Sequence, residues 1–182
     1  MKVIIFTDLD ASLLHEEAFS CLEIIDVLHS LLADGVLIIP NTSKTEVETR
    51  NVLESLSLRT PFIVENGAKL CDIHCGFQSI GETEKEFGID VSELDTRLKK
   101  LGALSFVNDF QPIAKLKPEK TSQILGLTGA ELEEALERRY SSLYQYIGPE
   151  PKIPFWQKNL LKVGLNLSQG GRAFAVSGCH DK

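Results

Sequence analysis

The first 64 residues alternate short apolar runs with longer segments of helical periodicity, and this alternation most constrains the fold. The apolar runs, residues 2–7, 36–39 and 61–64, predict strands. The segments between them, residues 17–33 and 44–56, carry apolar side chains at three- and four-residue steps and predict helices. This order favours right-handed crossovers and a parallel sheet. Because ligands of such sheets bind beyond the carboxyl ends of the strands, we expect the functional site there.

Polar side chains follow each predicted strand. Asp8 and Asp10 come after the first strand, Thr42 after the second and Asn66 after the third. Two carboxylates about 4 Å apart repel by about 4 kcal/mol at an effective dielectric near 20. A divalent cation offsets that repulsion, and Mg²⁺ accepts oxygen ligands such as the Asp8 carboxylate and the Asp10 carbonyl. The alternative for an isolated pair of acids is that they cap a turn or the following helix.

The same two aspartates suit covalent phosphoryl transfer. Asp8, at the end of its strand, can attack phosphorus and form an aspartyl-phosphate. Asp10, two residues later, can protonate the leaving alkoxide and afterwards deprotonate a water molecule. Magnesium would also reduce the repulsion between these carboxylates and an incoming phosphate dianion. The pattern therefore predicts that Asp8 and Asp10 are catalytic and bind the metal.

From about Phe77 the sequence pattern changes to that of an α+β insertion of roughly 95 residues, a size suited to a cap over the first domain's site. We expect helices at 91–101, 119–125 and 129–141, a strand at 104–107, and a hairpin of 161–167 with 172–177 around Gln169–Gly171. The predicted fold is α/β: a Rossmann-like parallel-sheet core with an inserted α+β cap. Its expected parts are core 1–76, cap 77–175 and a return to the core at 176–182, with the remainder of the core absent.

Composition and charge restrict the partners. The net charge of −7 argues against nucleic acid as a general partner, because phosphate backbones require a basic face. No apolar run is long enough to span a bilayer, and the N-terminal apolar stretch is too short for a signal peptide. We therefore expect a cytoplasmic protein without membrane partners. The four cysteines fit no common zinc spacing, so they are interpreted as free thiols: Cys21, Cys71, Cys75 and Cys179.

An ordered set of motifs resembles the haloacid dehalogenase superfamily of phosphohydrolases. Asp8-Leu9-Asp10-Ala11-Ser12 is similar to its first motif, DxDGT, with serine keeping the hydroxyl and alanine replacing glycine. The stretches Ser43-Lys44-Thr45 and Glu65-Asn66-Gly67-Ala68 resemble the SSKT and ENGA elements of the mannosyl-3-phosphoglycerate phosphatase family.

Three later segments extend this resemblance to essentially the whole chain. They are similar to the family's RxYSE, GGRF and GxxDKG elements, and they span residues 138–142, 170–173 and 178–182. Ser142 stands where an acid is usual, and Ala173 replaces an aromatic residue.

The resemblance implies a HAD-like core and a role for each matching residue. Thr42 would donate its hydroxyl to the phosphoryl oxygens, and Lys182 would be the superfamily's third-motif lysine. Ser43, Lys44 and Asn66 would contact phosphate or the glycerate carboxylate. From the cap, Arg138 and Arg172 would supply guanidinium groups, which suit carboxylates or phosphates as bidentate donors.

Each of these residues also has a structural interpretation. Thr42 and Ser43 can simply cap a helix, and Lys44 can be an exposed first-turn residue. Asn66 with Gly67 can be only a turn. Arg138 can lie on a solvated helix face, and Arg172 can be an ordinary hairpin residue.

The implied function is Mg²⁺-dependent hydrolysis of a small phosphorylated sugar-glycerate, mannosyl-3-phosphoglycerate or its glucosyl analogue, through an aspartyl-phosphate. Two alternatives stay open: another sugar-phosphate phosphatase of the superfamily, or a catalytically weak relic that binds a phosphorylated ligand or a partner protein. Full-length relatives continue past the equivalent of Lys182 with a GDSxND-like motif that carries a further magnesium carboxylate. Without it, we expect weaker magnesium binding and an open sheet edge with exposed apolar surface, which self-association can cover.

Overall fold

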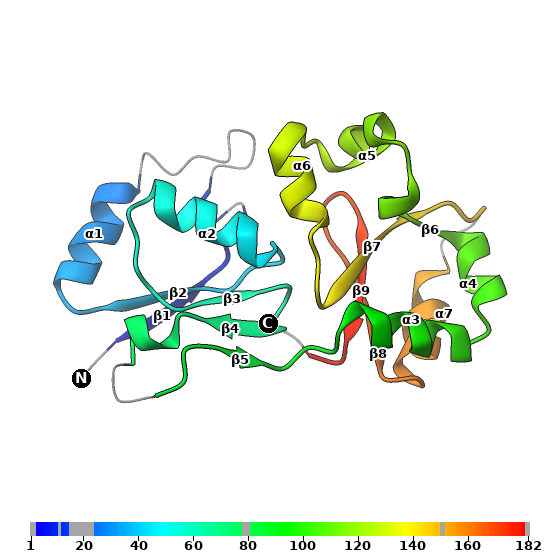
Figure 1. Cartoon of the computed structure of the whole chain (residues 1–182), viewed down its shortest axis with the longest axis horizontal. Coiled ribbons are helices and arrows are strands. Elements are labelled where there is room, and N and C mark those ends of the chain that lie inside the picture. Colours follow the sequence, from blue (N-terminus) through cyan, green and yellow to red (C-terminus); the bar gives the residue numbers. More distant parts are fainter. Residues whose placement is uncertain (1–2, 11, 15–23, 78–80, 150–151, 181–182) are drawn as a thin grey trace. The chain divides into compact units, whose positions relative to one another are not determined.

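The computed structural model describes residues 3–10, 12–14, 24–77, 81–149 and 152–180 (Figure 1). The described residues divide into two compact units, of which the first ends at Phe87 and the second runs from Gly88 to His180. No helix in the described ranges is both long and apolar enough to cross a membrane.

The first unit is built on parallel strands. Strand β1 (Ile4–Thr7) pairs in parallel with β2 (Leu37–Pro40), and β3 (Phe62–Val64) joins the end of β2 through a parallel bridge between Asn41 and Ile63. Figure 1 shows helices α1 (Ile25–Ala33) and α2 (Glu46–Ser55) along one side of these strands. The parallel order predicted from the sequence is therefore confirmed. Of the helix predicted at 17–33, residues 17–23 lie outside the described residues.

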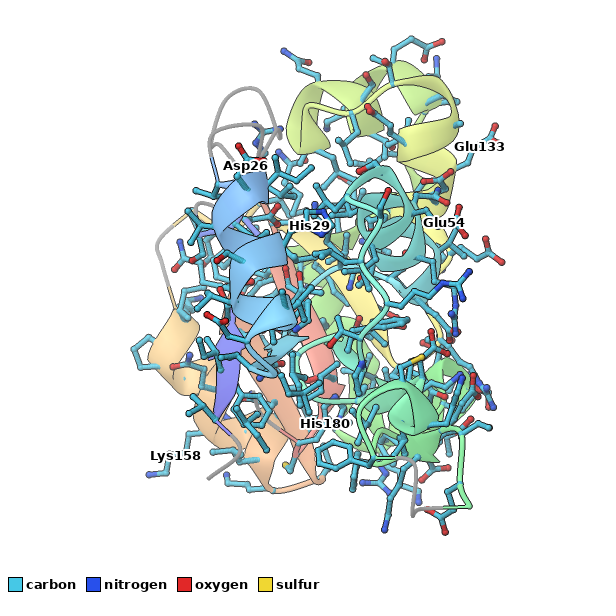
Figure 2. The ribbon with its side chains drawn as sticks, turned by 90° about the vertical axis from the view of Figure 1, so that its left-hand side faces the viewer. Asp26, His29, Glu54, Glu133, Lys158 and His180 are labelled. Atoms are coloured by element: carbon cyan, nitrogen blue, oxygen red, sulfur yellow. The ribbon has the colours of Figure 1, made fainter. Side chains whose placement is uncertain are left out.

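The core of this unit is a cluster of buried aliphatic and aromatic side chains contributed by both helices and all three strands or their ends. It contains Leu9, Leu14, Leu28, Ile38, Leu53, Leu56, Leu58, Phe62, Val64 and Cys71. Figure 2 shows His29 on the side of α1 that faces α2, and its Nε2 lies 3.2 Å from the carbonyl oxygen of Leu56. The buried Leu9 anchors the segment between the two aspartates to this core.

Two antiparallel strands extend the first unit beyond the predicted boundary at residue 76. Strand β4 (Lys69–Cys71) pairs with β3, and β5 (Lys85–Glu86) pairs with β4. The division of the chain consequently falls after Phe87. At the other end, strand β9 (Phe174–Gly178) belongs to the sheet of the second unit. Of the return to the core predicted at 176–182, residues 176–180 lie with the second unit, and residues 181–182 lie outside the described residues.

The second unit is an antiparallel sheet with helices. Its strands run in the order β6 (Phe110–Pro112), β7 (Ser141–Tyr146), β9 and β8 (Leu165–Gln169). Its helices are α3 (Val91–Lys100), α4 (Ala103–Asp109), α5 (Pro118–Leu125), α6 (Gly129–Leu136) and α7 (Ile153–Leu161). Successive residues of β7 pack into different hydrophobic clusters: Tyr144 belongs to the cluster that contains Trp156, and Leu143 packs against the cluster that contains Ile113. A strand's side chains alternate between its faces, so both faces of the sheet are packed.

The second unit differs from the sequence prediction in several elements. Residues 104–107, which were predicted as a strand, lie in α4. The prediction was wrong because a short apolar run is compatible with both a strand and a helix. The helix predicted at 129–141 ends at Leu136. Strand β7 begins at Ser141, the last residue of that predicted helix, and its other residues had no predicted structure. The hairpin is confirmed around residues 169–171, but its first strand begins at 165, and residues 153–161 form the unpredicted helix α7.

Candidate active site

The carboxyl end of β1 carries the two aspartates on either side of a buried leucine. The backbone N–H of Leu9 donates to Asp8 Oδ1 at 2.8 Å, and the Leu9 carbonyl accepts the N–H of Leu14 at 2.8 Å. These bonds turn the chain sharply after the strand while Leu9 stays in the core. Asp8 and Asp10 are both half-buried, so they lie at the surface of the sheet's end.

An ion pair joins the segment after β1 to the segment after β2. Lys44 Nζ lies 3.0 Å from Asp10 Oδ1, and only 14% of the Lys44 side chain is exposed. Its ammonium also lies 3.9 Å from Glu48 Oε1. The interpretation of Lys44 as an exposed first-turn residue is therefore wrong: Lys44 is a partly buried cation held against one of the two strand-end aspartates.

Thr42 is fully buried and is fixed by three hydrogen bonds at the end of β2. Its N–H donates to the Ile63 carbonyl at 3.0 Å, and its own carbonyl accepts the N–H of Asn66 at 2.9 Å. Its hydroxyl accepts the N–H of Lys44 at 3.2 Å. Because a hydroxyl can accept and donate together, Thr42 retains the ability to donate its proton to an oxyanion.

Helix α2 is capped by a residue that the sequence analysis did not assign to capping. The Thr45 hydroxyl accepts the N–H of Glu48, and the Glu48 carboxylate accepts the N–H of Thr45, which is a complete capping box. The interpretation of Thr42 and Ser43 as the helix cap is therefore wrong. The Ser-Lys-Thr stretch contains the signal that reveals this, since Thr45 precedes Glu48 by three residues.

The turn after β3 is held in a left-handed conformation. Glu65, Asn66 and Gly67 have φ values of 46°, 60° and 96°. Left-handed backbone costs roughly 1 kcal/mol for a residue other than glycine, so tertiary contacts must hold it. The bonds from Asn66 to Thr42 and from the Glu65 N–H to the Lys44 carbonyl, at 3.0 Å, provide them. Asn66 thus does form a turn, and the same turn is fastened to the end of β2.

The donor set at this end of the sheet suits magnesium. Mg²⁺ is commonly bound through one or two carboxylates, with water and substrate phosphate completing its octahedron. Asp8 and Asp10 provide two carboxylates on one short segment, with the Lys44 ammonium against one of them. Within the described ranges, no group of three or more His, Cys, Asp or Glu side chains is arranged to hold a metal. Among the described cysteines, Cys71, Cys75 and Cys179 form no disulfide.

The remaining predicted site residues lie elsewhere in the chain. Arg138 follows α6 and is half-buried, and its Nη1 donates to Ser141 Oγ at 2.9 Å, so it does not lie on a solvated helix face. Arg172, between β8 and β9, donates through Nη1 to the Leu125 carbonyl at the end of α5. Lys182 lies outside the described residues. A contact between these three residues and the strand-end site stays a prediction.

A second charged cluster of the first unit was missed by the sequence analysis. Lys69 Nζ lies 2.8 Å from both Glu46 Oε2 and Glu84 Oε2, and Arg50 pairs with Glu46 and Asp72 at 2.8 Å. Burial alone would lower the pKa of Lys69, but its hydrogen bonds to the two glutamates outweigh burial and raise it. One part of this cluster could have been predicted: Glu46 and Arg50 lie four residues apart on α2, a spacing at which opposite charges on a helix pair.

Comparison with known proteins agrees with this fold. Residues 5–85, which contain the strand-end cluster, match the model of the haloacid dehalogenase-like hydrolase family. Together with the relatives below, this match confirms the resemblance to the haloacid dehalogenase superfamily and its phosphatases that the motifs predicted.

The similar curated proteins are sugar-phosphoglycerate phosphatases. The chain is 29% identical to the mannosyl-3-phosphoglycerate phosphatase of Pyrococcus furiosus, over 98% of this chain and 73% of the relative. It is 27% identical to the glucosyl-3-phosphoglycerate/mannosyl-3-phosphoglycerate phosphatase of Persephonella marina, over 97% of this chain and 66% of the relative. The chain thus spans about two thirds to three quarters of the length of these relatives.

Solved structures show the same fold. A Thermoplasma acidophilum protein superposes with a TM-score of 0.67 at 15% identity, covering 100% of this chain and 67% of that one. A HAD subclass IIB sugar phosphatase superposes with a TM-score of 0.62 at 16% identity, covering 100% of this chain and 72% of that one. These likenesses confirm the predicted HAD-like architecture.

Proposed function

We propose that the protein is a magnesium-dependent phosphomonoester hydrolase of the cytoplasm that acts on mannosyl-3-phosphoglycerate or its glucosyl analogue. The observation that carries the proposal is the cluster at the strand ends. There the Asp10–Lys44 ion pair and the buried, triply bonded Thr42 bring carboxylate, ammonium and hydroxyl groups to one edge of the sheet. The curated relatives supply the substrate class.

In the proposed reaction, an Asp8 carboxylate oxygen attacks phosphorus, and the bond from phosphorus to the substrate oxygen breaks. Asp10 gives a proton to the departing alkoxide and later takes one from the water that hydrolyses the aspartyl-phosphate. Asp8 and Asp10 would hold Mg²⁺, which supplies positive charge against the phosphoryl oxygens. Lys44 fixes the Asp10 carboxylate by their 3.0 Å contact.

Substrate binding is proposed to use the two segments that follow β2 and β3. The Thr42 hydroxyl donates to a phosphoryl oxygen, and Ser43, Lys44 and Asn66 contact the phosphate or the glycerate carboxylate. Hydrogen bonds link Thr42 to Lys44 and to Asn66, which limits the movement of these residues before substrate arrives. Arg138, Arg172 and Lys182 keep their predicted substrate and phosphoryl contacts as part of the proposal.

The test is phosphate release from mannosyl-3-phosphoglycerate and from its glucosyl analogue, with Mg²⁺ and with a chelator. Replacing the attacking carboxylate in Asp8→Asn is expected to lower kcat by about 10⁴-fold. Asp26→Asn is the matched control, because Asp26 is exposed on α1 (Figure 2) and lies outside the cluster. Activity that survives both Asp8→Asn and the chelator would refute the proposal.

A second candidate is a phosphatase for other sugar phosphates, favoured by the structural likeness to a sugar phosphatase. The same assay with simple hexose phosphates separates the two, since the higher kcat/KM identifies the substrate class. If no compound is hydrolysed but mannosyl-3-phosphoglycerate raises Tm, the protein is a binding relic of the family instead.

A further inference from the structure

A pocket of about 430 Å³ lies within the second unit, at the place where its sheet loses a strand. Strand β6 pairs with β7 only from Tyr144 to Tyr146, because Pro112 ends β6 and a 3₁₀ turn at Ile113–Lys115 follows. The preceding β7 residues, Ser141–Leu143, continue beyond the end of β6 and line the pocket. Its volume falls in the range of small-molecule sites.

The pocket has an apolar wall. Leu98 of α3 and Phe106 of α4 are buried side chains that line it, and Leu136 lines it at the end of α6. Val107 also lines the pocket although 48% of it is exposed to water. An apolar group in the pocket would remove part of this Val107 surface from water, which is favourable.

The polar lining is positively charged, opposite in sign to the whole chain. Lys99, Lys115 and Arg138 line the pocket, and among the described lining residues the only acid is Asp95. The protein as a whole carries a net charge of −7. The bond from Arg138 Nη1 to Ser141 Oγ fixes one guanidinium nitrogen beside β7. Local positive charge in an acidic protein favours an anionic ligand.

A phenol adds a neutral donor to this lining. Tyr144 is buried, and burial, assisted by the charge of Asp95, raises its pKa to about 12. The Tyr144 hydroxyl therefore keeps its proton at neutral pH. Ser141 and Ser142 supply further hydroxyl groups to the lining.

We propose that this pocket binds a small organic anion that has an apolar body, with a carboxylate or phosphate group held by Lys99, Lys115 and Arg138 and the body against Phe106 and Val107. All of these residues belong to the second unit, and none of them follows the parallel strands of the first unit. Arg138 is shared with the proposed phosphatase function, where it contacts the substrate, whereas Lys99, Lys115, Phe106 and Val107 have no part in that function.

The experiment uses calorimetric titration with benzylphosphonate, which a phosphatase cannot hydrolyse, and with phenylacetate. Binding of either compound is expected, and the tighter one identifies a phosphate-like or a carboxylate head group. Inorganic phosphate and benzyl alcohol, each lacking one half of the ligand, are expected to bind at least about tenfold more weakly. The single tryptophan offers a second readout, because the Trp156 ring packs edge-on at 5.2 Å from Phe106.

Paired charge reversals locate the ligand. Lys99→Glu with Lys115→Glu is expected to raise the Kd for benzylphosphonate by about tenfold or more, since both exposed charges change sign. Lys117→Glu with Lys120→Glu makes the same change in net charge at exposed residues outside the pocket, and should leave Kd within about twofold.

The proposal is overturned if neither compound binds, if inorganic phosphate binds as tightly as benzylphosphonate, or if both charge-reversed variants behave alike. A Lys44→Gln variant separates the two sites. If it alone abolishes benzylphosphonate binding, the ligand occupies the strand-end site of the first unit and the pocket proposal fails. Loss of phosphatase activity in that variant with unchanged benzylphosphonate binding supports the pocket.

Discussion

Replacing Lys69 by methionine tests whether the charged cluster beside α2 stabilises the first unit. The Lys69 side chain is only 6% exposed, and its ammonium lies 2.8 Å from both Glu46 and Glu84. Methionine keeps most of the apolar stem and removes the charge, so the two carboxylates lose their shared partner. Arg50 still neutralises part of the charge of these carboxylates, since its Nη2 lies 2.8 Å from Glu46 and 3.7 Å from Glu84.

The expected loss follows from how far water reaches the cluster. Removing one member of a fully buried ion pair costs about 3–5 kcal/mol. The side chains of Glu46 and Glu84 are 30% and 42% exposed, so water can still hydrate the two carboxylates and the loss of stability is smaller. We expect the free energy of unfolding to fall by about 2 kcal/mol at pH 7, which moves the urea midpoint down by about 1 M.

The assay is urea unfolding followed by far-UV circular dichroism, with Lys85→Met as the matched control. Lys85 is an exposed lysine on the adjacent strand β5, and its replacement should cost less than about 0.5 kcal/mol. A loss of that small size for Lys69→Met as well would contradict the assignment of a stabilising cluster.

The pH dependence provides a second check of the same reasoning. Burial alone would raise the pKa of Glu46, but hydrogen bonds from Lys69 and Arg50 outweigh it and hold the pKa below the ordinary value of 4.5. Its contribution is therefore complete above pH 4.5 and is lost as the pH falls through the lowered pKa. The stability difference between wild type and Lys69→Met should shrink below pH 4.5; a difference that stays constant down to pH 3 would refute the reasoning.

Three further predictions concern the supports of the candidate site and the reactivity of its surroundings. Thr45→Ala removes the cap of α2 and should lower the free energy of unfolding by about 1 kcal/mol, measured by urea titration; no loss would mean that the capping box is not formed. Leu9→Ala leaves a cavity between the two aspartates and should cost about 3–5 kcal/mol in the same assay, whereas a loss under about 1 kcal/mol would show that Leu9 is not in the core. Burial raises the pKa of the Cys71 thiol to about 12, so mass spectrometry after iodoacetamide treatment should find Cys179, which is exposed, alkylated first and Cys71 only after unfolding; equal labelling of the folded protein would contradict this.

Much of the first unit could be predicted because its signals are local. The apolar runs and helical periodicity locate β1, β2, β3 and α2 to within a few residues, and the carboxyl ends of parallel strands necessarily meet at one edge. The second unit was less predictable. The apolar run at residues 104–107 is compatible with both a strand and a helix, so its local sequence does not distinguish them. In the structure this run is part of α4, which packs against β6 and α3.

The sequence by itself determined which chemical groups gather at the end of the sheet: Asp8 and Asp10 after one strand, Thr42 after the next and Asn66 after the third. Only the tertiary structure decided their partners. It paired Lys44 with Asp10 and joined the left-handed Asn66 turn to the Thr42 carbonyl. The physical reason is that hydrophobic periodicity acts over a few neighbouring residues, whereas ion pairs and backbone hydrogen bonds between loops depend on how the packed strands bring distant segments together.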